Sequence, residues 1–140
     1  MRNTARWAAT LGLAATAAGW PLAQAAQAAP ASLYAPSALV LTVGHGESTA
    51  TAAPARAVTL SCMPTATGTH PDPAGACAEL RGVRGDLMAL EARSDVMCTK
   101  EYDPVVVTVD GVWEGKRVSY ERTFANGCVK STYGASLFAF

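Results

Sequence analysis

The residues best suited to chemistry lie in the segment 97–104, Met-Cys-Thr-Lys-Glu-Tyr-Asp-Pro, which we call the lysine loop. It holds the Lys100–Glu101 peptide bond, and a bond after lysine is a preferred cleavage point for many proteases. Cys98, expected to form a disulfide, lies two residues before the lysine, and Pro104 restricts its own φ and the residue before it. A loop fixed on both sides loses less entropy on binding, so this segment is suited to presenting the bond to another protein.

The N-terminal segment 1–29 has the pattern of a secretory signal. Arg2 and Arg6 supply the positive start, 7–18 is an apolar run, and two Ala-Gln-Ala sites supply small residues for cleavage. The apolar run is too short to span a bilayer, which needs about 20 residues. We therefore expect a signal that is removed and a secreted, extracellular domain at 30–140, with no membrane contact in the mature form.

The chain beyond this signal is close to neutral. The sequence has eleven basic and eleven acidic residues, and removing Arg2 and Arg6 leaves nine against eleven. There is no basic run, and phosphate contacts need clustered positive charge, so we expect no nucleic-acid partner. About 110 residues remain, enough for one domain with a modest core that covalent cross-links would help to stabilise.

Four cysteines all follow the signal: Cys62, Cys77, Cys98 and Cys128. An even count in an exported chain indicates two disulfides, and three pairings are possible, of which the sequential one closes the shortest loops. Each bond would stabilise the fold by about 3 to 4 kcal/mol in the loop-entropy description. There is no Cys-x-x-Cys or Cys/His spacing typical of zinc, so we expect no metal and no cofactor.

Several β-prone runs surround the lysine loop. The first two, 38–43 and 57–62, are followed at 64–73 by Thr, Gly and Pro, which predict a long surface loop. A third and a fourth run, 105–113 and 116–124, follow the lysine loop.

The third run contains Asp110-Gly111, a tight-turn signal, so it and the fourth run predict a strand, a turn and a second strand. In the second, apolar and polar side chains alternate, which predicts a sheet covered on one face only, with Val118, Tyr120 and Phe124 on one side and Arg117, Ser119 and Glu121 on the other. The apolar end, 137–140, is expected to pair as an edge strand.

One helix is predicted within 73–92. Its apolar residues recur at spacings of three and four, at Ala76, Leu80, Val83, Leu87 and Leu90. Asp72 is a candidate cap and Pro73 suits the first turn, while Gly82 and Gly85 are points where the helix would end or bend. The predicted fold is α+β: an antiparallel sheet of about five strands with one longer helix, and room for a second, short one, on one face.

Three less specific interpretations compete with the presented bond. Lys100 alone is more often a solvated loop lysine. His45 and His70 are expected to be exposed turn residues, although with Lys100 they could serve acid-base catalysis in a small secreted ribonuclease, which the neutral charge disfavours. The strand edge at 105–109 could instead bind a peptide, which would make this a non-inhibitory secreted binding module.

In the order of its motifs, the chain from 33 to 140 resembles the Streptomyces subtilisin inhibitor family of secreted serine-protease inhibitors. The motifs are LYAPSALVLTVG, AVTLSC, GTHP, YDPV, TVDGVW, GKRVSYERTF and the terminal FAF, with four cysteines in register. The resemblance implies an inhibitor rather than an enzyme, the pairings Cys62–Cys77 and Cys98–Cys128, and a homodimer formed through the sheet. Exposed apolar positions within 38–43, together with Trp113, could supply that contact.

The resemblance also implies roles for the lysine loop in binding subtilisin-like and trypsin-like proteases by the substrate-like standard mechanism. Lys100 and Glu101 map onto the reactive bond. The positions of the protease-contact loop are Met97, Cys98, Thr99 and Tyr102. Thr99 stands where several relatives have proline and Glu101 where most have an apolar residue, while the lysine shifts the expected targets toward trypsin-like enzymes. Core contacts of Tyr102 and the Cys98 disulfide are expected to hold the ends of the bond together.

Overall fold

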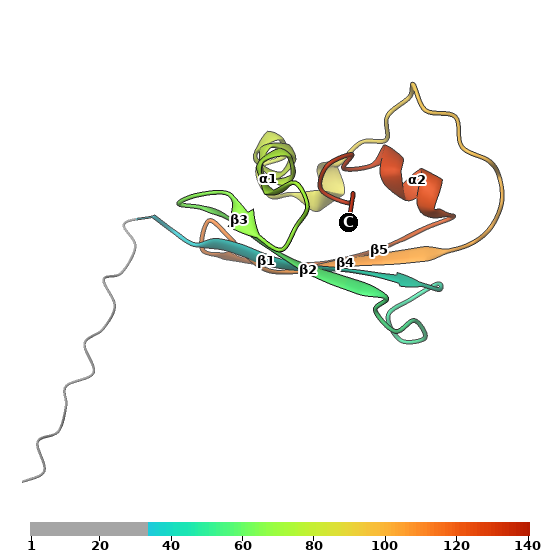
Figure 1. Ribbon diagram of the computed structural model, residues 1–140, viewed down its shortest axis with the longest axis horizontal. Coiled ribbons are helices and arrows are strands. Elements are labelled where there is room, and N and C mark those ends of the chain that lie inside the picture. The colour runs from blue at the N-terminus through green and yellow to red at the C-terminus, as the bar shows by residue number, and fades with distance from the viewer. Residues whose placement is uncertain (1–33) are drawn as a thin grey trace, which may run out of the picture. The chain divides into compact units, whose positions relative to one another are not determined.

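A computed structural model describes residues 34–140, so the predicted signal at 1–29 lies outside the described residues. Its strands form one antiparallel sheet in the order β3-β2-β1-β4-β5 (Figure 1). The strands are β1 (Ser37–His45), β2 (Arg56–Met63), β3 (Thr67–Gly68), β4 (Val105–Trp113) and β5 (Lys116–Phe124). The helices are α1 (Pro73–Gly82), the single 3-10 turn η1 (Leu87–Ala89) and α2 (Gly127–Thr132). This confirms the predicted α+β fold with five strands and a second, short helix.

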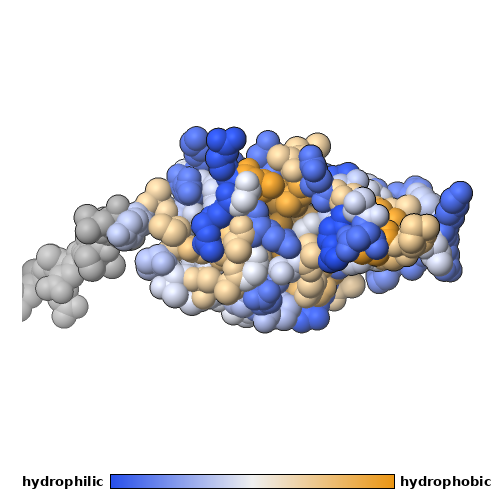
Figure 2. Space-filling model, turned by 90° about the horizontal axis from the view of Figure 1, so that it is seen from above, coloured by the Kyte–Doolittle hydropathy of each residue, from blue (hydrophilic) through white to orange (hydrophobic). Residues whose placement is uncertain are grey.

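One face of the sheet is covered and the other is open. Figure 1 shows α1, η1 and α2 on the same side of the sheet, and Figure 2 looks onto that side, where hydrophobic atoms lie in small groups between hydrophilic ones. The predicted alternation in β5 is confirmed, since Tyr120 and Phe124 are buried while Ser119 and Glu121 are exposed. The largest fully buried apolar side chains between the layers are Phe138, Leu41, Leu60, Leu80, Leu137, Val107 and Val109.

The predicted turn at Asp110-Gly111 is wrong, because β4 continues through it to Trp113 and the turn lies at Glu114 and Gly115. Gly111 is needed for a different reason. It has φ 146°, and a Cβ there would lie 2.2 Å from the carbonyl oxygen of Ala38 on the paired strand. Glycine therefore permits the close approach of β1 and β4 rather than a reversal of the chain.

Trp113 is 5% exposed and belongs to the core, so the suggestion that it supplies an exposed dimer contact is wrong. Its ring packs against Gly85, where an added Cβ would lie 2.3 Å from the indole Cδ1. The final side chain of β4 therefore anchors the segment after α1 to the sheet.

The helix predicted within 73–92 ends at Gly82. Its start is as expected, with Pro73 in the first turn and the Asp72 side chain accepting a hydrogen bond from the Gly75 N–H at 3.0 Å. Gly85 has φ 77°, a left-handed conformation that an α-helix does not contain, so the apolar residues beyond it continue as the separate turn η1. Leu87 and Leu90 still reach the core from there.

Two other predictions require correction. The loop at 64–73 contains the two-residue strand β3, which pairs with β2. The segment 137–140 forms no strand but folds over the core, where Leu137 and Phe138 are 0% and 1% exposed. A short apolar run has no periodicity long enough to distinguish an edge strand from a buried tail.

His70 is also buried, at 3% exposure, rather than exposed as predicted. Its Nε2 lies 3.1 Å from the Leu137 carbonyl oxygen, and its Nδ1 accepts from the Asp72 N–H at 3.1 Å. These bonds connect the start of α1 with the C-terminal segment.

Among the described residues, no helix is both long and apolar enough to cross a membrane.

Candidate functional site

The lysine loop lies on the surface between η1 and β4, and Figure 1 shows this connection as a wide arc beyond α2. Met97 is 95% exposed, and Thr99, Lys100 and Glu101 are all exposed. Four of the residues predicted to contact a protease are therefore brought together on one accessible stretch of chain. Residues 97–104 form no helix or strand, so their conformation depends on contacts with neighbouring elements.

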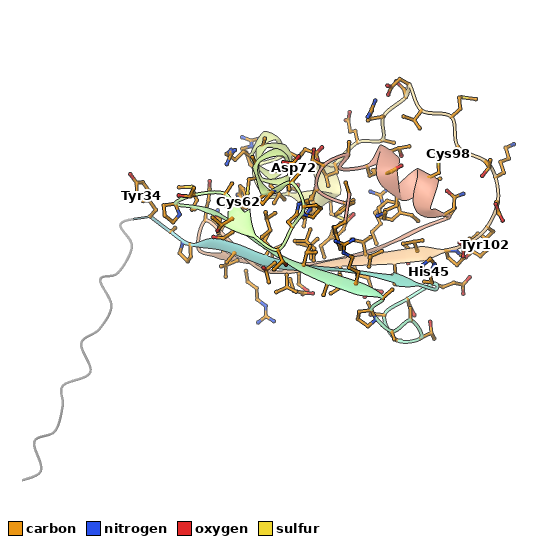
Figure 3. The ribbon with its side chains drawn as sticks, viewed as in Figure 1. Tyr34, His45, Cys62, Asp72, Cys98 and Tyr102 are labelled. Atoms are coloured by element: carbon orange, nitrogen blue, oxygen red, sulfur yellow. A yellow bond between two sulfur atoms is a disulfide. The ribbon has the colours of Figure 1, made fainter. Side chains whose placement is uncertain are left out.

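The first such contact is the disulfide between Cys98 and Cys128, which connects the loop entry to α2. Figure 3 labels Cys98 on the outer part of the arc. The other disulfide, Cys62–Cys77, joins β2 to α1 beneath the helix. Both pairings implied by the resemblance are confirmed.

The second contact is the side chain of Asn126, which is 7% exposed and lies between β5 and α2. Its Nδ2 donates to the Glu101 carbonyl oxygen at 2.7 Å and to the Thr99 carbonyl oxygen at 3.1 Å. Its Oδ1 accepts from the Val129 N–H at 2.9 Å and caps α2, which fixes the direction of the amide. One side chain therefore holds the backbone on both sides of Lys100.

Backbone bonds hold the loop exit. The Asp103 N–H donates to the Ala125 carbonyl at 2.9 Å, and the Gly46 N–H donates to the Pro104 carbonyl at 2.8 Å. His45 lies 4.0 Å from the Asp103 carboxylate, but both side chains are largely exposed, so this ion pair contributes little.

Tyr102 is 65% exposed, so the expectation that it is held by core contacts is wrong. Its hydroxyl instead donates to the Glu47 carboxylate at 2.6 Å. This hydrogen bond raises the pKa of the Tyr102 phenol above its ordinary value of 10.0, because the carboxylate favours the protonated form. Figure 3 shows Tyr102 and His45 at the same end of the sheet.

The exposed backbone of the lysine loop includes the Lys100–Glu101 peptide bond. His70 is buried, and both its ring nitrogens have hydrogen-bond partners at the start of α1 and in the C-terminal segment, away from the lysine loop. Within residues 34–140, no group of three or more His, Cys, Asp or Glu side chains could hold a metal ion. The Thr99 and Glu101 carbonyls, on either side of the exposed Lys100, are both held by the Asn126 amide.

Two supporting contacts were not predicted. The Asn126 amide could have been suspected from its position just before Gly127 and Cys128, since asparagine is a favoured helix cap. Glu47 gives no local signal, because 55 positions separate it from Tyr102.

Comparison with known proteins matches residues 35–126 to the family described as subtilisin inhibitor-like. The chain is 74% identical to the trypsin inhibitor STI2 of Streptomyces longisporus over 144 aligned residues, covering all of both chains. It is 72% identical to a subtilase-type protease inhibitor of Streptomyces coelicolor over the same length, again covering both chains fully.

The fold is also similar to a solved structure, that of Streptomyces caespitosus sermetstatin in complex with Bacillus licheniformis subtilisin. The TM-score is 0.67 at 44% sequence identity, and the match covers 75% of this chain and 99% of the other.

Proposed function

Because this chain belongs to the subtilisin inhibitor-like family, we propose that it blocks serine proteases by presenting Lys100–Glu101 as a substrate-like reactive bond. As a member of this family it is a protease inhibitor and not an enzyme. The observation that carries the proposed site is the Asn126 amide, which holds the carbonyls of Thr99 and Glu101 around an exposed lysine.

Binding would place the Lys100 side chain in the primary pocket of the protease. An acidic pocket floor would pair with the lysine ammonium in a trypsin-like enzyme. The broad pocket of a subtilisin would take the methylenes and leave the charge near the rim. Met97 and Thr99, both exposed, would fill the subsites before the lysine.

Inhibition requires that the cut bond be resealed faster than water removes the acyl group. The protease serine oxygen would bond to the Lys100 carbonyl carbon, and the C–N bond to Glu101 would break as its nitrogen takes a proton. Asn126 holds the Glu101 carbonyl, and the Asp103 N–H is bonded to Ala125, so the new amine would stay beside the ester. The effective molarity of such a positioned group reaches about 10⁵ M or more, which favours re-formation of the peptide bond over hydrolysis.

The test is a titration of trypsin and of subtilisin with purified protein, following the residual cleavage of small chromogenic substrates. We expect stoichiometric inhibition that is lost in Lys100→Ala and kept in Lys116→Ala, a matched control at the exposed start of β5. Mass spectrometry after long incubation should find cleavage at Lys100–Glu101 only. Full inhibition by Lys100→Ala would overturn the reactive bond, and no inhibition by the wild type would favour a non-inhibitory binding module.

Secretion is part of this proposal. The signal pattern at 1–29 supports export of the domain 30–140, and both disulfides of the described chain suit an oxidising, extracellular compartment. N-terminal sequencing of the protein from culture medium would test both points. An intact N-terminus on protein retained in the cell would contradict them.

A homodimer formed through the open face of the sheet is the proposed state in solution. Val40 is 46% exposed on that face. Two exposed alanines lie on the same face, Ala38 two residues before it on β1 and Ala57 on β2 opposite Thr42, which supports an apolar contact. Sedimentation of the wild type should give a dimer at micromolar concentration, and Val40→Asp should shift the protein toward monomer. A monomeric wild type at that concentration would rule the dimer out.

A further inference from the structure

The loop 46–55, which connects β1 to β2, is attached to β5 rather than left free at the sheet end. The Thr123 hydroxyl donates to the Glu47 carbonyl at 2.7 Å. Farther along, the Thr49 hydroxyl and N–H donate to the Glu121 carboxylate at 2.7 and 3.2 Å. Because β4 lies between β1 and β5, these bonds bring the loop across the open face, and they fix the backbone position of Glu47.

The fixed Glu47 meets the part of the lysine loop that follows the candidate reactive bond. Its carboxylate accepts the Tyr102 hydroxyl at 2.6 Å, while the neighbouring Gly46 N–H donates to the Pro104 carbonyl at 2.8 Å. At 65% exposure, packing alone does not fix the Tyr102 ring. The orientation of the ring therefore depends on the hydrogen bond that its hydroxyl donates to Glu47.

We infer that Glu47 is a positioning residue for the reactive bond: through Tyr102 it holds the leaving-group side of Lys100–Glu101 in the geometry that favours resealing. The inference rests on the proposed function and extends it to a residue outside the lysine loop. Glu47 would act on the inhibitor itself, by fixing the ring that a protease meets just after the cut bond.

The two sides of the bond differ in a way that makes this support necessary. Before the bond, the Cys98–Cys128 disulfide provides a covalent attachment. After the bond, hydrogen bonds and the weak, exposed His45–Asp103 ion pair hold the chain. The hydrogen bond from Tyr102 to Glu47 is made by a side chain that a bound protease would touch. A hydrogen bond to a charged acceptor is stronger than a neutral one, although exposure to water reduces that advantage.

The first experiment is a double-mutant cycle with trypsin as the target. Glu47→Ala and Tyr102→Phe should each raise the inhibition constant about twofold to tenfold, which corresponds to the loss of one hydrogen bond of about 0.5 to 1.4 kcal/mol. The double variant should be no weaker than Tyr102→Phe alone, because Glu47 acts through that hydroxyl. On long incubation with trypsin, a larger fraction of each variant than of the wild type should be cleaved at Lys100–Glu101.

Two further variants separate positioning from a general structural effect. Glu47→Gln keeps an acceptor oxygen and should restore most of the inhibition lost in Glu47→Ala. Glu114→Gln removes a matched exposed carboxylate at the other end of β4, and it should inhibit like the wild type. Thermal unfolding of all variants should show similar midpoints, since the hydrogen bond is exposed.

A spectroscopic measurement reads the contact without any protease. Alkaline titration, followed by the ultraviolet absorbance of phenolate, should show one tyrosine whose pKa falls in Glu47→Ala, and Tyr102→Phe should remove that tyrosine from the curve.

Three results would overturn the inference. The first is an inhibition constant of Glu47→Ala equal to that of the wild type. The second is a double variant whose loss of inhibition equals the sum of the two single losses. The third is a pKa of Tyr102 that is the same in the wild type and in Glu47→Ala. If the wild type inhibits neither trypsin nor subtilisin, the proposed function itself fails and the inference fails with it. Inhibition that depends on Lys100 but not on Glu47 removes only the inference.

Discussion

Asn126→Asp should separate support of the lysine loop from helix capping, because the asparagine amide performs both tasks with different atoms. Aspartate keeps an oxygen for the Val129 N–H and suits the positive end of a helix. It loses the nitrogen that donates to the carbonyls of Thr99 and Glu101, and places a carboxylate oxygen against them instead. The backbone around the proposed reactive bond should therefore lose its support while α2 stays capped.

The size of the effect follows from the two donated hydrogen bonds. Each contributes about 1 kcal/mol, so their loss weakens the loop by about 2 kcal/mol, or about 30-fold. We expect Asn126→Asp to raise the inhibition constant for trypsin, or the rate of hydrolysis at Lys100–Glu101, by this factor. Asn126→Ala loses the cap as well, and its free energy of unfolding should fall by about a further 1 kcal/mol.

The assay measures three quantities for the wild type and both variants: the inhibition constant, the fraction of cut chain by mass spectrometry after long incubation, and the unfolding free energy in denaturant. Asn126→Asp is expected to match Asn126→Ala in the first two quantities, while its unfolding free energy stays about 1 kcal/mol above that of Asn126→Ala because the cap is kept. An Asn126→Asp protein that inhibits as tightly and resists cutting as well as the wild type would refute the role of the amide.

Three further predictions concern the disulfide, the core and alkaline pH. Replacing Cys98 and Cys128 together by Ala opens a crosslink spanning 30 residues, so unfolding free energy in guanidinium should fall by about 3 to 4 kcal/mol; an unchanged denaturation midpoint contradicts this. His70→Ala leaves the buried Leu137 carbonyl and the partly buried Asp72 N–H without their partner. Calorimetry should show a loss of about 1 to 3 kcal/mol in the free energy of unfolding, with a loss near zero as the contrary result. Burial raises the pKa of Tyr120 above 10.0, and nearby Arg122 partly opposes this rise. The stability that the protonated Tyr120 phenol contributes is therefore complete below pH 10 and is lost as pH rises through its folded-state pKa. The thermal midpoint of Tyr120→Phe should therefore fall less than that of the wild type between about pH 8 and 11, and parallel curves would count against it.

The sequence predicted those parts of the fold that depend on local pattern. Period-two alternation in 116–124 gave the strand and its buried face, and Asp72 before Pro73 gave the start of α1. The end of that helix was less clear, because Leu87 and Leu90 keep a helical spacing after the chain has left the helix. Spacing alone does not show that Gly85 adopts a left-handed conformation.

The errors arose where distant segments decide the structure. Asp110-Gly111 has the composition of a turn, but the glycine is explained by Ala38 on the paired strand. The lysine and the bond after it were chosen from the sequence, whereas Glu47 became visible only once β1, β5 and the lysine loop met at one end of the sheet. Chain separation hides such partners from any local reading.

The packing of the C-terminal segment affects how far an exopeptidase could degrade the chain from that end. The Leu137 carbonyl is bonded to His70, the Phe138 carbonyl accepts from the Lys130 ammonium at 2.6 Å, and the Phe140 ring lies against both His70 and Lys130. Ala139 is exposed and Phe140 half-buried, so an exopeptidase trimming from Phe140 would have to pull Phe138 and Leu137 out of the core to go further. The fold thus keeps Leu137 and Phe138 out of reach while the proposed reactive bond, Lys100–Glu101, stays exposed.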